Sequence, residues 1–162
     1  MSPRQRSQSA ILAGAKEAIA HVGSYESNMV DIAARAKVSR ATVYNNFADK
    51  DEMLYSLIDA EIDRLRTVAQ GADSPATALY RLSQEISHDP ALRKMVVTDP
   101  EDVALMISHT SHPLWLKAEA ALDEIFGDGA LVMRWLIGQV TAPLNDGQAR
   151  AQAAKIARSL TH

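Results

Sequence analysis

Residues Asn28–Lys50 read NMVDIAARAKVSRATVYNNFADK, a pattern that predicts two short helices joined by a tight turn and followed by the start of a third helix. Asn28 is a favourable N-cap for the first of these helices, and Asp31, three residues later, can complete a capping box. Apolar residues then recur at helical spacing from Met29 to Ala36. The segment is therefore predicted to pack one face of a short helix against the rest of its domain.

Ser39 is the expected N-cap of the second short helix. Val38 precedes it and Val43 stands at the fourth helical position, so the two can form a hydrophobic staple that fixes how the chain enters the helix. Val43 and Phe47 are expected to point inward. The outward and flanking positions of this helix hold polar or small side chains and no carboxylate: Arg40, Ala41, Thr42, Tyr44, Asn45 and Asn46.

Two crossing helices, the second with a polar and non-acidic outer face, are typical of a helix-turn-helix that binds DNA. Asn can bridge adenine, Arg can bridge guanine, and a Thr methyl can contact thymine. The alternative is a helical hairpin inside an ordinary bundle, but such a hairpin would favour Glu, Lys and Ala at its outer positions. The predicted DNA-binding residues are Asn28, Arg40, Ala41, Thr42, Tyr44, Asn45, Asn46 and Lys50, with Asn28, Tyr44 and Lys50 assigned to the phosphate backbone.

The run DIAARAKVSRATVYNNFADKDEML, residues 31–54, resembles the signature of the tetracycline-repressor (TetR) family of one-component transcriptional regulators. One departure is Lys37, where the family usually has glycine; a left-handed conformation there would cost on the order of 1 kcal/mol. The resemblance implies that Lys50 contacts a phosphate. It also implies that the last two helices pair with a second subunit, and that a ligand changes the separation of two recognition helices.

The chain of 162 residues carries a net charge of −3, but this charge is unevenly distributed. Residues 1–50 hold seven Lys and Arg against four Asp and Glu, which gives +3 and leaves −6 for the remainder. This asymmetry favours a DNA-facing end and a separate regulatory end. We predict a helix-turn-helix DNA-binding domain over residues 1–48 and an effector-binding and dimerisation domain over residues 49–162.

The fold is predicted to be all-α. Residues 1–9 are expected to form a mobile arm or a disordered terminus, with Arg4 and Arg6 available to DNA. A first helix is expected to end at Gly23, and Asp49 is expected to cap a connecting helix that extends to about residue 69. Four residues followed by Pro (Ser74, Asp89, Asp99 and His112) look like helix starts. Helices are expected near residues 75–87, 90–97, 100–109, 113–126, 129–142 and 147–160.

Homodimerisation is predicted through the last two helices. Residues 130–140 read ALVMRWLIGQV, a sequence that is apolar nearly all round, and the final helix has an alanine-rich face that would permit close helix approach. The alternative is that both faces belong to a core within one chain. Two-fold DNA sites require two recognition helices, so a dimer fits a palindromic operator.

A small apolar effector is expected to bind the second domain, with Met and Trp supplying either an adaptable cavity or ordinary core. Its predicted contacts are Leu57, Leu65, Leu82, Met106, His109 and Met133. The protein is therefore expected to be a repressor released by this effector; the alternative is a helix-turn-helix regulator or architectural protein without a ligand.

Other classes of function lack their motifs in this sequence. His88, His109 and His112 lack the spacing of metal ligands on one helix face, and no catalytic acid–base pair or nucleophile motif is seen, so no metal, cofactor or enzymatic activity is predicted. The absence of cysteine, of an apolar leader and of a long apolar stretch fits a cytoplasmic protein that does not cross a membrane.

Overall fold

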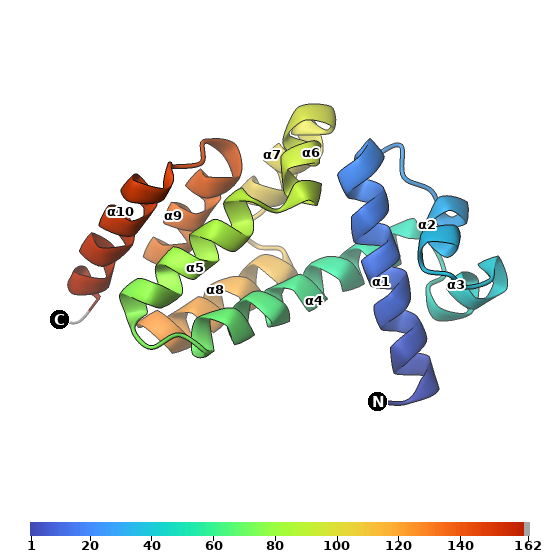
Figure 1. Cartoon of the computed structure of the whole chain (residues 1–162), viewed down its shortest axis with the longest axis horizontal. Coiled ribbons are helices and arrows are strands. Elements are labelled where there is room, and N and C mark those ends of the chain that lie inside the picture. The colour runs from blue at the N-terminus through green and yellow to red at the C-terminus, as the bar shows by residue number, and fades with distance from the viewer. Residues whose placement is uncertain (161–162) are drawn as a thin grey trace. The chain divides into compact units, whose positions relative to one another are not determined.

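The computed structural model describes residues 1–160, and over this range the chain is helical and has no strand (Figure 1). The prediction of an all-α fold is confirmed. The helices are α1 (Pro3–Val22), α2 (Met29–Arg35), α3 (Arg40–Asn46), α4 (Lys50–Gln70), α5 (Pro75–Ser87), α6 (Pro90–Thr98), α7 (Pro100–Ser108), α8 (Pro113–Phe126), α9 (Gly129–Thr141) and α10 (Asp146–Ser159). None of these helices is long and apolar enough to cross a membrane.

The chain divides into two compact units, which we call the first and the second unit. The first unit comprises Met1–Ala60 together with Pro90–Val103, and the second comprises Glu61–Asp89 together with the chain from Ala104 onward. The first unit therefore holds α1, α2, α3 and the beginning of α4, and it also includes α6. The division thus differs from a simple boundary at residue 48, because a segment much further along the chain returns to the N-terminal helices.

The first unit is built around α1, which packs against α2, α3 and α6. Its buried apolar side chains include the inward positions of α1, α2 and α3, together with Met53 and Leu57 from α4 and Ala91 from α6. Gly14 of α1 allows a close approach of α2, because a Cβ there would lie 2.8 Å from the backbone nitrogen of Ala36. Burial of this continuous apolar surface is the main force that fixes α2 and α3 on α1.

The first helix begins earlier than predicted. Residues 3–9 belong to α1, so the expected mobile arm over residues 1–9 is wrong. Ser2 accepts a hydrogen bond from the Gln5 backbone N–H at 3.2 Å, and the Gln5 side chain accepts one from the Ser2 N–H at 2.7 Å. This capping box and Pro3 in the first turn stabilise the start of the helix. The prediction missed this start because the segment is polar and has no apolar periodicity.

The four helices predicted to start at proline do begin at Pro75, Pro90, Pro100 and Pro113. The Ser74 side chain caps α5 by accepting from the Thr77 N–H, and the His112 ring caps α8 by accepting from the Leu114 N–H. The six predicted helix ranges from residue 75 onward hold to within one residue at each end. Proline at the first helical position is therefore a dependable start signal in this chain.

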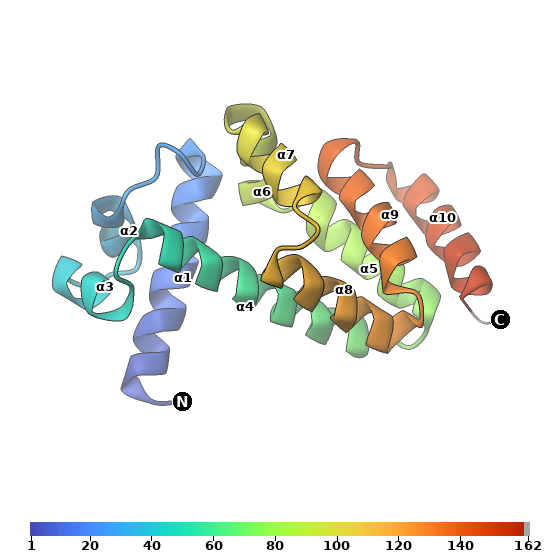
Figure 2. The same ribbon diagram turned by 180° about the vertical axis from the view of Figure 1, so that it is seen from behind.

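The second unit packs α5 against both α9 and α10, and α8 against α9 (Figures 1 and 2). Its core includes Leu79, Leu82, Val132 and Leu136. Tyr80 of α5 and Arg150 of α10 add a polar link between their helices, because the Arg150 guanidinium lies 3.9 Å from the ring centre of Tyr80 and donates to its hydroxyl at 2.8 Å.

The apolar faces of the last two helices are used largely within the chain. Ala149 and Ala153 of α10 are each 1 % exposed, so the expectation that the alanine face is available to a partner is wrong for these two residues. On α9, Val132 and Leu136 are buried in the same core, whereas Leu131 remains 40 % exposed. The apolar surface of α9 that remains exposed to solvent is thus narrower than its sequence suggests.

Candidate DNA-binding surface

The helix α3 is anchored by two apolar side chains and by its N-cap. Val43 is fully buried and Phe47 is 4 % exposed, and Val38 packs against the same core, as the staple predicted. The Ser39 hydroxyl accepts a hydrogen bond from the Thr42 N–H at 3.0 Å. A helix of only seven residues is marginal alone, so these contacts are what hold it in place.

The opposite side of α3 presents side chains suited to base edges. Arg40, Ala41, Tyr44 and Asn45 are exposed, and Tyr44 keeps 54 % of its surface accessible. All four are among the predicted outward or flanking positions, and with no carboxylate among them the surface is compatible with the negative charge of DNA. The arrangement is therefore that of a recognition helix.

Thr42 and Asn46 are half-buried and already engaged within α3. The hydroxyl groups of Thr42 and Ser39 lie 2.8 Å apart, and the Asn46 side-chain amide donates to the Thr42 carbonyl at 2.8 Å. The same Asn46 leaves its side-chain oxygen buried without a partner. A hydrogen bond from the Asn46 amide to DNA, as predicted, would require that amide to release the Thr42 carbonyl.

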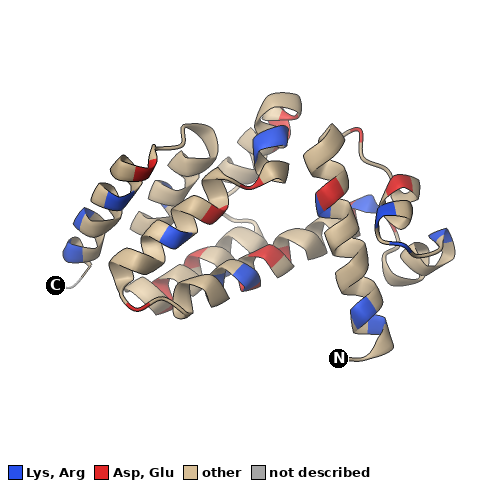
Figure 3. Cartoon of the chain, viewed as in Figure 1, with Lys and Arg blue, Asp and Glu red and all other residues tan. Residues whose placement is uncertain are grey.

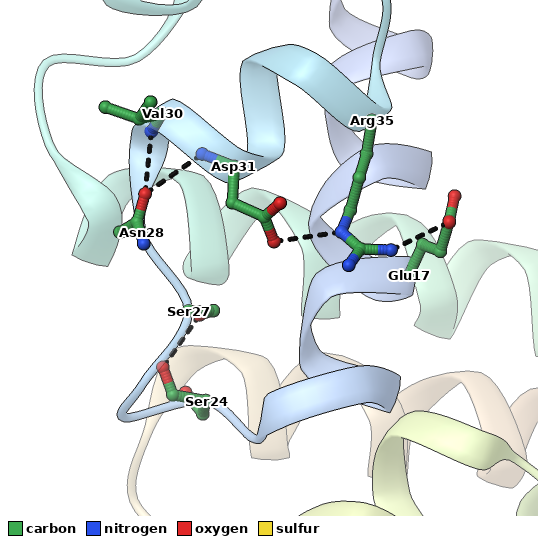
Figure 4. Close-up of polar contacts among 7 residues, drawn as sticks. All are labelled: Glu17, Ser24, Ser27, Asn28, Val30, Asp31 and Arg35. Carbon is green, nitrogen blue, oxygen red and sulfur yellow. Dashed lines mark hydrogen bonds and ion pairs between the residues drawn. The ribbon is translucent and has the colours of Figure 1, made fainter.

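The helix α2 begins at Asn28, whose side-chain oxygen accepts from the N–H groups of Val30 at 3.1 Å and Asp31 at 2.9 Å (Figure 4). The predicted N-cap is therefore present. The capping box is absent, because the Asp31 carboxylate accepts from the Arg35 guanidinium at 2.9 Å instead. Arg35 also donates to Glu17 of α1 at 2.8 Å, and the hydrogen bond to Asp31 is the main cause that raises the pKa of Arg35. The pairing ties α2 to α1.

Lys50, predicted to contact a phosphate, instead forms hydrogen bonds to the backbone of its own chain. Its ammonium donates to the backbone carbonyls of Ser24 at 2.6 Å, Tyr25 at 3.0 Å and Ser27 at 2.9 Å. These three bonds use the three donors of a lysine ammonium. The side chain therefore joins the start of α4 to the turn that precedes α2.

Lys37, between α2 and α3, has a backbone φ of 55°. This is the left-handed conformation that favours glycine, and Lys37 takes it up in the turn of the helix-turn-helix. The N–H of Val38 reaches back to the Ala33 carbonyl at 3.1 Å, which is the type of bond that closes a helix in this way. The left-handed conformation that the sequence raised for this position is confirmed.

Asp99 contributes to this surface in a way that its sequence does not reveal. Because proline follows it, its position indicates a cap of α7, but its carboxylate accepts from the Ser24 and Tyr25 N–H groups, each at 3.0 Å. Burial alone would raise the pKa of Asp99. The hydrogen bonds from Thr98 and from the two N–H groups, together with the charge of Lys50, lower it by more, so the pKa of Asp99 lies below its usual range. No local pattern connects residues 74 and 75 positions apart, which is why sequence reasoning missed this role.

Basic side chains occur at several points on the first unit, and α3 carries no acidic residue (Figure 3). Within residues 1–50, however, Arg35 is paired and Lys50 is held by carbonyl groups. The positive charge left to attract DNA is therefore modest, which agrees with a site that relies on a few specific contacts.

The six predicted effector contacts differ in their surroundings within the chain. Leu57 is buried in the core of the first unit, whereas Leu65 and Leu82 belong to the core of the second. Met133 is also buried, Met106 is half-buried, and His109 is exposed with its ring edge-on to His112 at 5.5 Å. Among the described residues, no group of three possible metal-ligating side chains comes together.

Comparison with known proteins agrees with the helix-turn-helix geometry. Residues 11–57 match the sequence model of the family described as bacterial regulatory proteins, tetR family. This range includes most of α1, the whole of α2 and α3, and the start of α4. No curated protein has a sequence that matches this chain.

Solved structures with the same fold cover nearly the whole chain. The TetR family repressor AlkX from Dietzia sp. strain DQ12-45-1b, implicated in biodegradation of n-alkanes, is 20% identical, with 99% of this chain and 96% of that chain covered and a TM-score of 0.63. The hemolysin II transcriptional regulator HlyIIR is 18% identical, with coverage of 98% and 99% and a TM-score of 0.54. The fatty acid degradation regulator FadR from Bacillus halodurans is 19% identical, with coverage of 99% and 95% and a TM-score of 0.52.

The fold and the exposed face of α3 define a helix-turn-helix DNA-binding protein. Residues 11–57 are similar to the bacterial regulatory proteins of the tetR family, as the run at residues 31–54 predicted, and the solved structure of a TetR family repressor shares the fold of the chain.

Proposed function

We propose that this TetR-family regulator is a repressor that binds a palindromic operator as a homodimer and is released by a small apolar effector. The observation that carries the proposal is the exposed, non-acidic face of α3, held outward by buried Val43 and Phe47. We assign base-edge contacts to Asn45 and Arg40 and phosphate contacts to Asn28 and Tyr44.

Selection from random duplex DNA tests the operator. The wild-type protein is expected to enrich an inverted repeat whose half-site centres lie about one helical turn or a multiple of it apart. Asn45→Ala should relax selection at one or two positions of each half-site without abolishing binding, because one base contact is lost. Gln70→Ala, an exposed amide at the C-terminal end of α4, is the matched control and should select the wild-type motif. Recovery of no enriched motif would remove the proposal.

The effector part rests on the second unit, whose core is apolar around Leu65 and Leu82. Few charged groups occur among the predicted contacts, so the ligand should be apolar with one or two polar anchors. Two proteins of similar structure are a repressor implicated in biodegradation of n-alkanes and a regulator of fatty acid degradation, which suggests decane and palmitate as the first probes.

Thermal shift with decane and palmitate, using acetate as the polar control, measures effector binding directly. A bound effector should raise the unfolding temperature and weaken operator affinity by a coupling of about 1–3 kcal/mol. Operator DNA must weaken effector binding by the same factor, so both titrations should give one coupling value. Stabilisation without operator release would contradict release as the mechanism.

A regulator without a ligand is the second candidate, and a specific observation favours it. Leu57 and Leu82 are buried against other apolar side chains of their own units, so their burial within the chain needs no ligand. If a broad panel of apolar and amphipathic probes leaves both the unfolding temperature and operator affinity unchanged, this candidate replaces the ligand-gated one.

A further inference from the structure

The turn between α1 and α2 is held from two sides by charged groups of opposite sign. On one side, Asp99 accepts from the Ser24 N–H through Oδ2 and from the Tyr25 N–H through Oδ1, both at 3.0 Å. Neither of these N–H groups donates to a backbone carbonyl within the described residues. A carboxylate that uses both oxygens in this way fixes the orientation of two successive peptide groups.

On the other side, Lys50 donates to the carbonyls of Ser24, Tyr25 and Ser27. The Ser27 hydroxyl also donates to the Ser24 carbonyl, at 2.7 Å. Ser24 is thus held at both its N–H and its C=O by side chains that are distant in sequence. The Asp99 carboxylate therefore accepts from the N–H groups of the turn, and the Lys50 ammonium donates to its carbonyl groups. The two opposite charges also attract each other.

The fit between Asp99 and the turn is close. Gly23 has a φ of 91°, and a Cβ added there would lie 2.3 Å from Thr98 Oγ1 and 2.5 Å from Asp99 Oδ2. The Thr98 hydroxyl donates to Asp99 Oδ2 at 2.6 Å, which orients the carboxylate. Asp99 is only 7 % exposed. The contact is therefore a built part of the first unit, and residue 23 must be glycine for it to form.

We propose that Asp99 and Lys50 are positioning residues for DNA recognition, which hold the turn so that Asn28 and α2 are presented in register with α3. The turn leads directly to Asn28, which caps α2, and α2 packs on α3. This inference rests on the proposed function, since it assigns a role within operator binding. It gives Lys50 a different task from the phosphate contact that the family resemblance implies.

The first test separates specific from non-specific binding. Asp99→Asn keeps the shape but presents an amide N–H₂ toward a turn N–H, so one of the two bonds is lost. Affinity for the selected operator should fall on the order of tenfold while affinity for random DNA stays unchanged. The matched control is Asp102→Asn, an exposed carboxylate of α7 in the same unit, which should leave both affinities at wild-type values.

Lys50→Met distinguishes positioning from phosphate contact. A positioning role predicts lower affinity for the operator, unchanged affinity for random DNA, and an unchanged slope of log affinity against log salt. A phosphate contact predicts equal loss on all sequences and a slope smaller by about one. The second pattern would overturn the positioning role of Lys50.

Amide chemical shifts in the DNA-free protein report the mechanism. In Asp99→Asn, the Ser24 and Tyr25 signals should move, and so should those of Val30 and Asp31, whose N–H groups are bonded to Asn28. Movement confined to Ser24 and Tyr25 would show a merely local structural role and would overturn the proposal.

A milder variant guards against loss of folding. Thr98→Val removes the hydroxyl that orients Asp99 while preserving the shape of the side chain, and it should reduce operator selectivity roughly two- to fivefold. Wild-type selectivity in both folded variants would overturn the positioning role alone. A wild-type protein that selects no motif would instead overturn the proposed function, and the positioning role with it.

Discussion

Individual residues of the first unit show how a tertiary contact can override a local signal. Asp31 and Asp99 both stand at positions typical of helix N-terminal capping, yet Asp31 pairs with Arg35 and Asp99 binds the turn at Ser24 and Tyr25. A carboxylate near a helix start has several possible partners, and the geometry of the folded unit decides among them. Capping by Ser39 and His112, in contrast, follows the sequence.

Lys37 provides a stability prediction at the residue scale. Its φ of 55° is strained for a side chain with a Cβ, so Lys37→Gly should raise the free energy of unfolding by about 1 kcal/mol. Chemical denaturation without DNA measures this change. Lys37→Ala is the control, because it removes the same charge but keeps the Cβ, and it should give no comparable gain. Equal stability of the two variants would indicate that the turn relaxes around Lys37.

Asp99 provides a pH prediction at the same scale. Its folded-state pKa is lowered, since the bonds from Thr98, Tyr25 and Ser24 and the charge of Lys50 outweigh the effect of burial. Ionised Asp99 therefore stabilises the folded state above its unfolded pKa of about 4, and this contribution is lost as the pH falls through the folded value. The wild type should lose more stability than Asp99→Asn between neutral and acidic pH. Parallel stability curves for the two proteins would contradict this linkage.

The positions of the helices in the sequence were easier to predict than the way in which the helices pack against one another. The prolines at 75, 90, 100 and 113 mark four helix starts correctly, because proline at the first helical position is favoured whatever the helix packs against. The start of α1 was missed because the Ser2–Gln5 capping box lies in a polar segment without apolar periodicity. The packing of α6 on α1 could not be read from local patterns at all, since it depends on contacts between residues far apart in the chain.

N-caps of comparable chemistry in the two units allow a prediction at the element scale. Ser39 caps α3 and Ser74 caps α5, each by accepting from the N–H three residues later. Replacement of either serine by alanine should reduce stability by about 1 kcal/mol, because one N–H at the helix start loses its partner. Operator affinity should fall further in Ser39→Ala than in Ser74→Ala, since α3 carries the base-reading face. Denaturation and operator titration on both variants test this, and equal operator affinities would argue against α3 as the recognition helix.

At the scale of the whole molecule, the candidate site was predictable to the extent that it lies within one short segment. The exposed positions of α3 and the buried Val43 and Phe47 follow from helical periodicity and the Ser39 cap. The contacts of Asp99 and Lys50 with the turn between α1 and α2 could not be predicted from periodicity, because they join three separate segments of the chain. The proposed effector contacts were the least predictable part, since an apolar stripe does not reveal whether it packs in the first unit, as Leu57 does, or in the second, as Leu82 does.

We propose that the homodimer, expected from the need for two recognition helices, forms through the outward side of α9. Leu131 is 40 % exposed, and Gly138, seven residues later on the same helix face, has open space where a Cβ would stand. Leu116 of the neighbouring α8 is also 55 % exposed. Exposed apolar groups on helices that contact each other are candidates for contact with a second copy of the chain.

Leu131→Glu tests this surface, because a carboxylate buried between two subunits would lose hydration without gaining a partner. The variant should fold normally yet sediment as a monomer at micromolar concentration, and its operator affinity should fall because only one recognition helix is then presented. Ala151→Glu, at an exposed position of α10, is the matched control and should sediment and bind like the wild type. A dimeric Leu131→Glu protein would place the interface elsewhere, whereas a monomeric wild type would contradict the dimer itself.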